Sequence, residues 1–346
     1  MKHQTTRYGE IPFYKIGTFG NTADAFISKK LFLEYKTKYS FPKKGDILIS
    51  ASGTIGRAVI YDGKPAYFQD SNIVWIDNDE TLVKNDFLFY AYSNVKWNTE
   101  HTTILRLYND NFRNTLIPLP PLNEQSAIAN ILSALDRYLC ALNSLILKKE
   151  GVKKALNFEL LSQRKRLKGF NQAWQRVRLG DIANYLTSNL SVEQITQQGK
   201  IKVYDVNNFI GYTDTTFISD KPYISIVKDG SVGRVRILPP KTNILSTMGA
   251  LIANHRTTTE FLFYLLSNFD FKNFTSGSII PHIYFKDYKE KTIFLPPLNE
   301  QIAIANILSA LDNEITSLKN KKRQFENIKK ALNHDLMSAK IRVLEK

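Results

Sequence analysis

Two stretches of the chain carry apolar residues at alternating steps of four and three. The first stretch places them at Ile128, Leu132, Leu135, Leu139, Leu142 and Ile146. The second places them at Ile304, Leu308, Leu311, Ile315, Leu318, Phe325, Leu332 and Leu336. This spacing puts the apolar side chains on one stripe of a helix, in a heptad seam. Because neither stretch contains a proline, we expect two helices of about 40–45 residues, each about 60–65 Å long.

Both expected helices begin with the same sequence, LPPLNEQ. Residues 119–136 return at 295–312 with seventeen of eighteen positions identical, at an offset of 176. Asn123 follows two prolines at the place of an N-cap, and Glu124 faces the positive end of the helix from its first turn. A repeat of half the chain length indicates two copies of one unit. Two matching seams in one chain most simply pack against each other, and pairing with a second chain is the alternative.

The segments between the seams have a different pattern. Residues 11–122 and 172–298 are rich in Phe, Tyr, Ile, Val and Thr, in short runs broken by glycine and turn residues, which predicts strands. FLFYAYSN at 87–94 returns as FLFYLLSN at 261–268, and both predict short packed helices. The fold class is therefore α+β, with two mixed α/β variable domains, each followed by a long helix. We place the boundaries at 1–122 (first variable domain), 123–168 (first long helix), 169–298 (second variable domain) and 299–346 (second long helix).

The composition and net charge of the chain indicate what kind of partner it binds. The chain has 43% hydrophobic and 23% charged residues, which is typical of a soluble globular protein. Its net charge of +15 favours a polyanionic partner, and the excess is spread through the chain with no basic tail. Solubility alone is the other reading of this charge. The single cysteine, Cys140, excludes an intrachain disulfide and suits a reducing compartment, so we expect a cytoplasmic protein with no membrane segment.

These features together resemble one family. Tandem variable domains, each ending in a Pro-Pro-Leu-x-Glu-Gln helix start and a long helix, resemble the specificity subunit of a type I restriction-modification system over nearly the whole chain. The resemblance implies two target recognition domains, each reading one half of a bipartite double-stranded DNA sequence. It implies that the long helices form an antiparallel coiled coil with pseudo-twofold symmetry, which sets the unread spacer and docks methyltransferase subunits.

The resemblance also implies the remaining partners. Two methyltransferase subunits would use S-adenosylmethionine, and two restriction subunits would use ATP and Mg, so that this chain binds no cofactor and has no catalytic residue. The alternative from another class is a coiled-coil scaffold or adaptor protein without specific DNA recognition. Salt dependence separates the two, because phosphate contacts weaken steeply as salt rises.

The first copy of the unit is shorter at its start than the second. Trp174–Ala183 (WQRVRLGDIA) opens the second copy about 25 residues before Gly199, and the matching Gly9 has only eight residues before it. The family resembled here usually has such an opening in both copies. We therefore expect the first variable domain to lack a leading strand and helix, which bears on its stability and specificity.

The sequence offers no catalytic or metal-binding constellation. We find no Gly-rich phosphate loop followed by Lys-Ser/Thr, and LPPLNEQ lacks the aromatic residue of an amino-methyltransferase motif. We assign Glu124 and Glu300 to helix capping instead of catalysis. The histidines, at positions 3, 101, 255, 282 and 334, have no metal-ligand spacing.

Two matched loops are the best candidates for DNA contact. Gly53–Arg57 and Gly230–Arg234 place glycines where backbone approaches phosphate and an arginine fork beside them. The alternative is a hairpin turn with a solvated arginine. Arg106 and His282 are aligned at offset 176 and differ between the copies, so they are candidates for base reading, or else residues of a connecting loop. The full set of DNA-binding candidates is Lys43, Lys44, Thr54, Arg57, Arg106, Lys228, Ser231, Arg234, Arg236, Lys241 and His282.

Small residues near each helix start are candidates for subunit docking. They leave a face that a partner subunit can approach closely, although packing between the two helices would use the same residues. The candidates are Ser126, Ala127 and Asn130 in the first copy, and Ala303 and Asn306 in the second, with Ala129 and Ala305 beside them.

Overall fold

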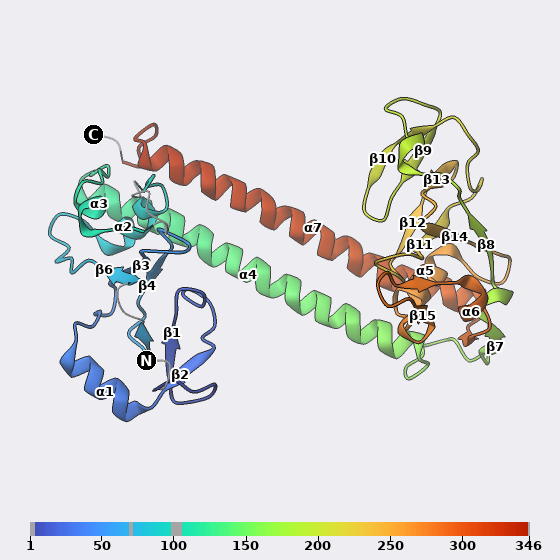
Figure 1. Ribbon diagram of the computed structural model, residues 1–346, viewed down its shortest axis with the longest axis horizontal. Coiled ribbons are helices and arrows are strands. Elements are labelled where there is room, and N and C mark those ends of the chain that lie inside the picture. Colours follow the sequence, from blue (N-terminus) through green and yellow to red (C-terminus); the bar gives the residue numbers. More distant parts are fainter. Residues whose placement is uncertain (1–3, 69–71, 98–105, 345–346) are drawn as a thin grey trace. The chain divides into compact units, whose positions relative to one another are not determined.

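The computed structural model describes residues 4–68, 72–97 and 106–344 (Figure 1). The chain divides into two compact units. The first comprises residues 1–143 and 320–346, and the second comprises residues 144–319. Each unit contains one variable domain, half of the first long helix and half of the second. Each long helix therefore begins in one unit and ends in the other.

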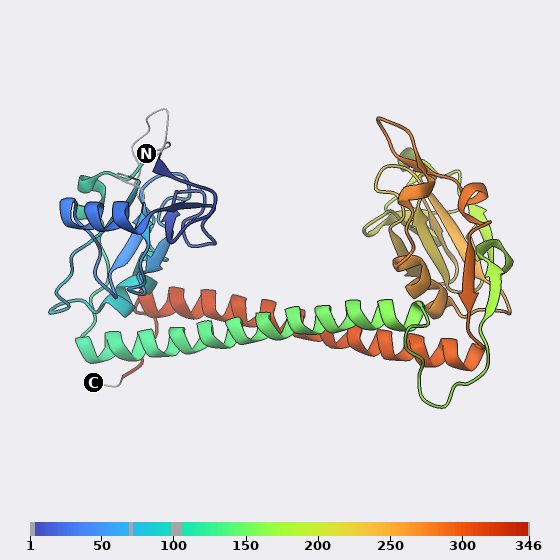
Figure 2. The same ribbon diagram turned by 90° about the horizontal axis from the view of Figure 1, so that it is seen from below.

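The long helices are α4 (Leu122–Leu161) and α7 (Leu298–Met337), of 40 residues each. In the first unit the start of α4 packs against the end of α7, where the rings of Tyr138 and Phe325 lie 4.8 Å apart. In the second unit the end of α4 packs against the start of α7, where Lys149 pairs with Glu314. The helices are thus antiparallel within each unit (Figures 1 and 2). Seam residues are buried as expected, including Leu132, Leu142, Ile146, Ile304, Leu308 and Ile315.

The helices begin one residue earlier than their expected cap. The Gln125 N–H donates to the carbonyl of Pro121 (2.9 Å), and Gln301 repeats this bond to Pro297. Proline fits here because its ring sets a helix-compatible φ and its carbonyl is free to accept the first helical bond. Asn123 consequently lies inside the first turn, where its side chain accepts from the Glu124 N–H (2.9 Å).

The first variable domain contains two three-stranded sheets, ordered β2-β1-β5 and β4-β3-β6. Strands β1 and β5 are parallel, and the other pairs are antiparallel. The elements are β1 (Ile11–Tyr14), β2 (Ala25–Ile27), α1 (Lys29–Lys38), β3 (Ile47–Ser50), β4 (Ala58–Ile60), β5 (Tyr67–Phe68), β6 (Ile73–Trp75), α2 (Asn85–Tyr92) and α3 (Asn109–Arg113).

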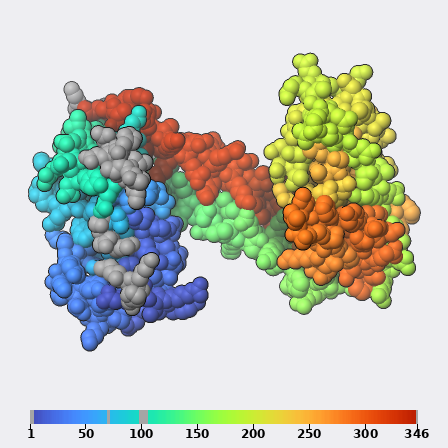
Figure 3. Space-filling model, in the orientation of Figure 1, coloured from blue at the N-terminus to red at the C-terminus, as the bar shows by residue number. Residues whose placement is uncertain are grey.

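The second variable domain repeats this plan with extra strands. Its sheets are ordered β10-β9-β13, β12-β11-β14-β8, β15-β16 and β17-β7. The elements are β7 (Gln175–Arg178), the 3₁₀ turn η2 (Leu179–Asp181), β8 (Ala183–Thr187), η3 (Val192–Gln194), β9 (Ile201–Tyr204), β10 (Phe209–Thr213), β11 (Tyr223–Val227), β12 (Val235–Leu238), β13 (Thr242–Ile244), β14 (Met248–Ala253), α5 (Thr259–Ser267), η4 (Lys272–Phe274), β15 (Thr275–Ser276), β16 (His282–Ile283), α6 (Phe285–Tyr288) and β17 (Thr292–Leu295). One outer face of this domain is drawn in Figure 3, coloured from yellow-green to orange.

The opening of the second domain, Trp174–Ala183, forms β7, the turn η2 and the first residue of β8. The expectation of a leading strand and helix is therefore corrected to two strands joined by a 3₁₀ turn. β7 pairs with β17, and β8 pairs with β14. In the described part of the first domain, no strand takes the place of β7 or β8.

The FLFY segments form the short helices α2 and α5, as predicted, and they join each domain to the long helices. Phe87 and Phe261 are fully buried. The Tyr264 hydroxyl donates to Asp312 of α7 (2.9 Å), and Lys153 of α4 pairs with the same carboxylate. Tyr90, Asp136 and Lys329 repeat this arrangement in the first unit. Burial of the hydroxyl and the neighbouring carboxylate raise the pKa of Tyr264 well above its ordinary value, so the hydroxyl stays a donor.

Candidate nucleic-acid interface

The loop between β3 and β4 has a fixed backbone. Gly53 and Gly56 adopt φ values of +68° and +80°, in the left-handed region that glycine enters without strain. The Gly56 N–H donates to the carbonyl of Ser50 (2.9 Å), which closes the loop across the strand ends. A Cβ placed on Gly56 would lie 2.3 Å from Nε1 of Trp97, so this backbone rests directly on the indole ring.

The loop between β11 and β12 in the second domain is built the same way. Gly230 and Gly233 have φ values of +83° and +79°, and the Gly233 N–H donates to the carbonyl of Val227 (2.9 Å). A Cβ on Gly233 would meet the ring of Phe271 at 2.6 Å. The equivalence proposed from sequence therefore holds at the level of backbone conformation.

The structure places Arg106 and His282 beside these loops. Both residues lie about fifty positions from the loops in the sequence, so the sequence did not indicate this contact. Arg106 forms a β-bridge with Ser52, and His282 forms the matching bridge with Asp229. The next residues, Leu107 and Ile283, donate to the carbonyls of Ala51 (2.8 Å) and Lys228 (2.9 Å). The residue that bridges to the glycine loop is thus polar in both domains, but it is an arginine (Arg106) in the first and a histidine (His282) in the second.

His282 is held in place by a carboxylate. Its Nδ1 lies 2.7 Å from Oδ1 of Asp229, and both side chains are about one-third exposed. This contact fixes the ring and leaves Nε2 as the second polar edge of the imidazole. Such a group can donate or accept at a base edge, according to its protonation.

The two loop arginines are exposed but tethered. Arg57 donates through Nη1 to the carbonyl of Phe19 (3.0 Å), and Arg234 donates through Nη2 to Oδ1 of Asn207 (3.0 Å). Arg236 donates to the carbonyl of Asn207 (3.0 Å). Its guanidinium lies 5.1 Å from the ring centre of Tyr204. These contacts hold a guanidinium beside each loop with donors left for phosphate or guanine.

The remaining candidates divide by position. Thr54 and Ser231 are exposed within the loops, and Lys228 lies half-buried just before the second loop. Lys43 and Lys44 precede β3, and Lys241 follows β12, so all three lie at the opposite strand ends from the loops. The structure does not bring these three lysines to the glycine loops. Lys43 pairs with Asp77 (3.0 Å), and this hydrogen bond raises the pKa of Lys43.

The docking candidates lie on the first turns of α4 and α7. Ser126, Asn130 and Asn306 are exposed, and Ala127 and Ala303 are half-buried. Ala129 and Ala305 are instead buried in the hydrophobic cores of their units, so they do not contribute to an outer face.

The glutamates of LPPLNEQ have a role that sequence reasoning missed. Glu300 is fully buried, and its carboxylate accepts from Nη2 of Arg166 (2.6 Å) and from Nε1 of Trp174 (2.9 Å). In the first unit Arg342 makes the equivalent pair with Glu124, and this hydrogen bond lowers the pKa of Glu124. The repeat of Arg166 at Arg342, at the same offset of 176, is the signal that would have found it.

The glutamines of the motif attach each variable domain to its helix. Gln125 accepts from the Lys84 N–H (2.8 Å) and donates to the carbonyls of Leu82 (3.0 Å) and Pro120 (2.8 Å). Gln301 makes the equivalent bonds to Thr258, Arg256 and Pro296. Because both side chains are fully buried, each amide must be satisfied by these backbone groups.

No group of three potential metal ligands comes together among the described residues. His3 and His101 lie outside the described residues. In the part of the chain that the structure covers, no helix combines the length and apolar character needed to cross a membrane.

Comparison with known proteins agrees with this architecture. A putative type I restriction enzyme specificity subunit of Haemophilus influenzae is 61% identical over 146 residues, which is 42% of this chain and 37% of that protein. The putative MjaX specificity subunit of Methanocaldococcus jannaschii is 28% identical over 86% of this chain and 79% of its own length. The crystal structure of a type I restriction-modification S subunit from M. genitalium has the same fold, with a TM-score of 0.66, 20% identity and coverage of 97% and 91% of the two chains.

The family match covers both copies of the unit. The type I restriction modification DNA specificity domain matches residues 1–150 and 171–327, which include both glycine loops and both helix starts. Since the match extends over most of the sequence and the fold agrees, the chain belongs to the family of type I restriction modification DNA specificity domains.

Proposed function

We propose that this chain is the DNA sequence-recognition subunit of a type I restriction-modification enzyme. Each variable domain reads one half of a bipartite double-stranded target, and α4 and α7 set the spacer. The observation that carries the proposal is the pair of matched loops. Their glycine backbones and arginines are the same in both domains, whereas the adjoining polar residue is Arg106 in one and His282 in the other. Shared parts suit phosphate contact, and differing parts suit base reading.

The charge supports a nucleic-acid partner. The net charge of +15 includes arginines that stand beside both loops. Arginine forks bind phosphate or the O6 and N7 of guanine in two-donor geometry. The location of the protein follows from this partner, and we propose that the chain acts in the cytoplasm.

We further infer that catalysis belongs to partner subunits. Two methyltransferase subunits dock on the helix starts around Ser126, Ala127, Asn130, Ala303 and Asn306, and two restriction subunits join them. S-adenosylmethionine, ATP and Mg are held by those partners. One solved structure with the same fold comes from a type I restriction-modification system whose complex assembly was determined. This supports an assembly of the same kind for this chain.

The test is DNA binding by the chain with and without its methyltransferase subunits. We expect weak binding alone and tight, sequence-dependent binding in the complex. Arg57→Ala and Arg234→Ala should each weaken binding by about 1–2 kcal/mol and reduce the slope of log K against log salt by about 1. Lys30→Ala, an exposed charge on α1, is the matched control and should change neither quantity.

The DNA sequence that the complex methylates distinguishes a DNA-recognition subunit from a scaffold protein. His282→Ala and Arg106→Ala should each relax base preference in one half-site and leave the other unchanged. A complex that forms but binds all duplexes equally would support the scaffold reading. A chain that binds no methyltransferase subunit would contradict the proposal altogether.

A further inference from the structure

The second domain carries a short hairpin with a projecting tip. Strands β15 and β16 pair in antiparallel fashion, and residues 277–281 join them. Gly277 has a φ of +91°, and a Cβ placed on it would overlap the carbonyl oxygen of Ile280, so this tight turn requires glycine. The hairpin is the orange loop that projects from the second domain in Figure 2.

The base of the β15–β16 hairpin is anchored in the domain. Ile283 is buried in the main core of the domain together with Phe271. The hydroxyl of Thr275 donates to the carbonyl of Phe271 (2.9 Å). The carbonyl of Pro281 accepts from the Gly230 N–H (2.9 Å), which attaches the hairpin to the second glycine loop. The hairpin and that loop therefore belong to one surface of the domain.

The tip of the hairpin is apolar and lies in solvent. Ile279 is 92% exposed, and its neighbour Ile280 is 55% exposed. An apolar side chain gains free energy when a partner removes it from water. Because the base of the hairpin is anchored, the tip can gain this energy without the ordering of a flexible segment. The two isoleucines are therefore suited to contact a partner.

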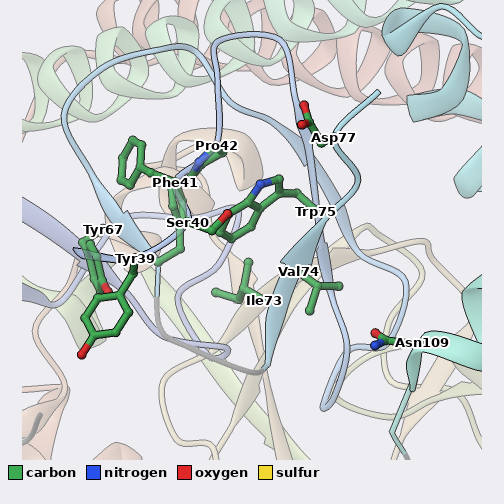
Figure 4. A pocket seen from close by; sticks show the side chains of 11 residues that line it. Tyr39, Ser40, Phe41, Pro42, Tyr67, Ile73, Val74, Trp75, Asp77 and Asn109 are labelled. Atoms are coloured by element: carbon green, nitrogen blue, oxygen red, sulfur yellow. The ribbon is translucent and has the colours of Figure 1, made fainter. Parts of the chain in front are cut away.

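The projecting tip differs from the exposed apolar surface of the first domain. There a hollow of about 650 Å³ is lined by Tyr39–Pro42 and by β6, and Figure 4 shows the side chains around it. A hollow receives a projecting group of its partner, whereas a projecting hairpin enters a groove. The major groove of B-DNA is wide enough to admit a two-stranded β-ribbon.

The charges around the hairpin suit a polyanion. No aspartate or glutamate occurs from residue 271 to residue 286, and the exposed residues Lys272 and Lys286 flank the hairpin. The carboxylate of Asp229, beside the hairpin, lies 2.7 Å from Nδ1 of His282. A basic surface of this kind attracts nucleic acid. The charge and the shared surface with the glycine loop both favour DNA as the partner of the tip.

We propose that the β15–β16 hairpin enters the major groove of the half-site that the second domain reads, and that Ile279 and Ile280 pack on the C5-methyl groups of thymine. The inference rests on the proposed function and names a base that this domain selects. The hairpin combines an apolar tip with the polar His282. This combination matches the major groove, which displays both the hydrogen-bonding base edges and the thymine methyl group, whereas the minor groove displays no methyl group.

The experiment uses the complex of the full chain with its methyltransferase subunits and the duplex that this complex modifies. In two further duplexes, the thymines of one half-site or of the other are replaced by deoxyuridine, which lacks only the C5-methyl group. In the half-site of the second domain, we expect this replacement to weaken binding by the unchanged complex about fourfold for each methyl group contacted.

A double variant, Ile279→Ala with Ile280→Ala, tests the tip itself. It should bind the original duplex more weakly and should lose the difference between thymine and deoxyuridine in one half-site, because the groups that contact the methyl are gone. The half-site should be the one whose base preference His282→Ala relaxes. Leu33→Ala, a change at a residue of α1 that is 52% exposed, is the control and should keep the difference.

Three results would overturn this inference alone. They are a half-site with no thymine in either strand, equal affinity of the unchanged complex for the original and the deoxyuridine duplexes, and a double variant that still distinguishes these duplexes. A double variant that no longer assembles with the methyltransferase subunits would also overturn it, because the tip would then contact protein. If the unchanged complex binds every duplex equally, the proposed function fails and the inference fails with it.

Discussion

At the scale of single residues, the repeated helix start LPPLNEQ is a set of structural contacts. Asn123 and Asn299 bond the following amides, the glutamates pair with arginines beyond the far end of the other helix, and the glutamines bond the variable domains. Sequence reasoning assigned Glu124 and Glu300 to the helix dipole. The structure shows an ion pair as well, because the segment that follows the antiparallel partner helix brings an arginine to that turn.

The ion pair of Glu124 predicts a pH dependence. Since Arg342 lowers the pKa of Glu124 in the folded chain, the pair stabilises the fold above the ordinary pKa of a glutamate, about 4.3. That stability is lost as the pH falls through the lowered folded-state value. The urea midpoints of the unchanged chain and of Glu124→Gln should therefore differ at pH 7 and converge at acid pH. Glu34→Gln, an exposed carboxylate on α1, should show no such convergence.

At the scale of elements, the long helices owe their stability to the seam. Leu308 is fully buried in the core of the second unit, whereas its neighbour Ile307 is 37% exposed. The same helix therefore has one face that packs on α4 and the variable domain and another that is open to partners. The carboxylate of Asp312 on α7 bonds Tyr264 of α5 and Lys153 of α4. These contacts hold the three helices together.

Adjacent substitutions on α7 test this division. Leu308→Ala should lower the free energy of unfolding by about 3 kcal/mol, because it removes buried methyl groups and leaves a cavity. Ile307→Ala should change it by less than about 0.5 kcal/mol, as for most exposed positions. Thermal or urea unfolding measures both. Equal losses at the two positions would mean that the seam is not the face that stabilises the helix.

At the scale of the whole molecule, the chain is a duplicated unit whose copies have diverged in their variable domains. Each unit is completed by a helix half from the other copy, so that neither copy is independent of the other. The proposed function uses both results of the duplication, since the repeated helices join two domains that need not read the same sequence.

Lengthening both helices tests the proposed measuring role. An insertion of seven residues, one heptad, into both α4 and α7 near the unit boundary keeps the seam in register and adds about 10 Å to each helix. The complex should then modify sites whose half-sites are unchanged and whose spacer is longer by about three base pairs. Sequencing of modified bases reports both. An unchanged spacer would contradict the measuring role, and a four-residue insertion that breaks the seam is the destabilised control.

Much of the fold is present in local patterns. The heptad seam, the repeat at offset 176 and the FLFY helices are each periodicities over short windows, so they predicted α4, α7, α2 and α5 and the α+β class. The shared Gly53–Arg57 and Gly230–Arg234 loops were also predicted as a matched pair, because glycine spacing controls local backbone conformation. The N-cap was predicted at Asn123, two residues late, because the helix begins at Leu122 and the carbonyl of Pro121 accepts its first hydrogen bond.

The sequence by itself determined the duplication, the fold class and the family resemblance. Only the tertiary structure decided that Arg106 and His282 stand beside the glycine loops, that Glu124 and Glu300 are ion-paired, and that Lys43, Lys44 and Lys241 lie at the far strand ends. The physical reason is distance along the chain: strand pairing and the antiparallel packing of α4 and α7 set these positions, and both join residues tens to hundreds of positions apart, beyond the short windows in which sequence periodicity is seen.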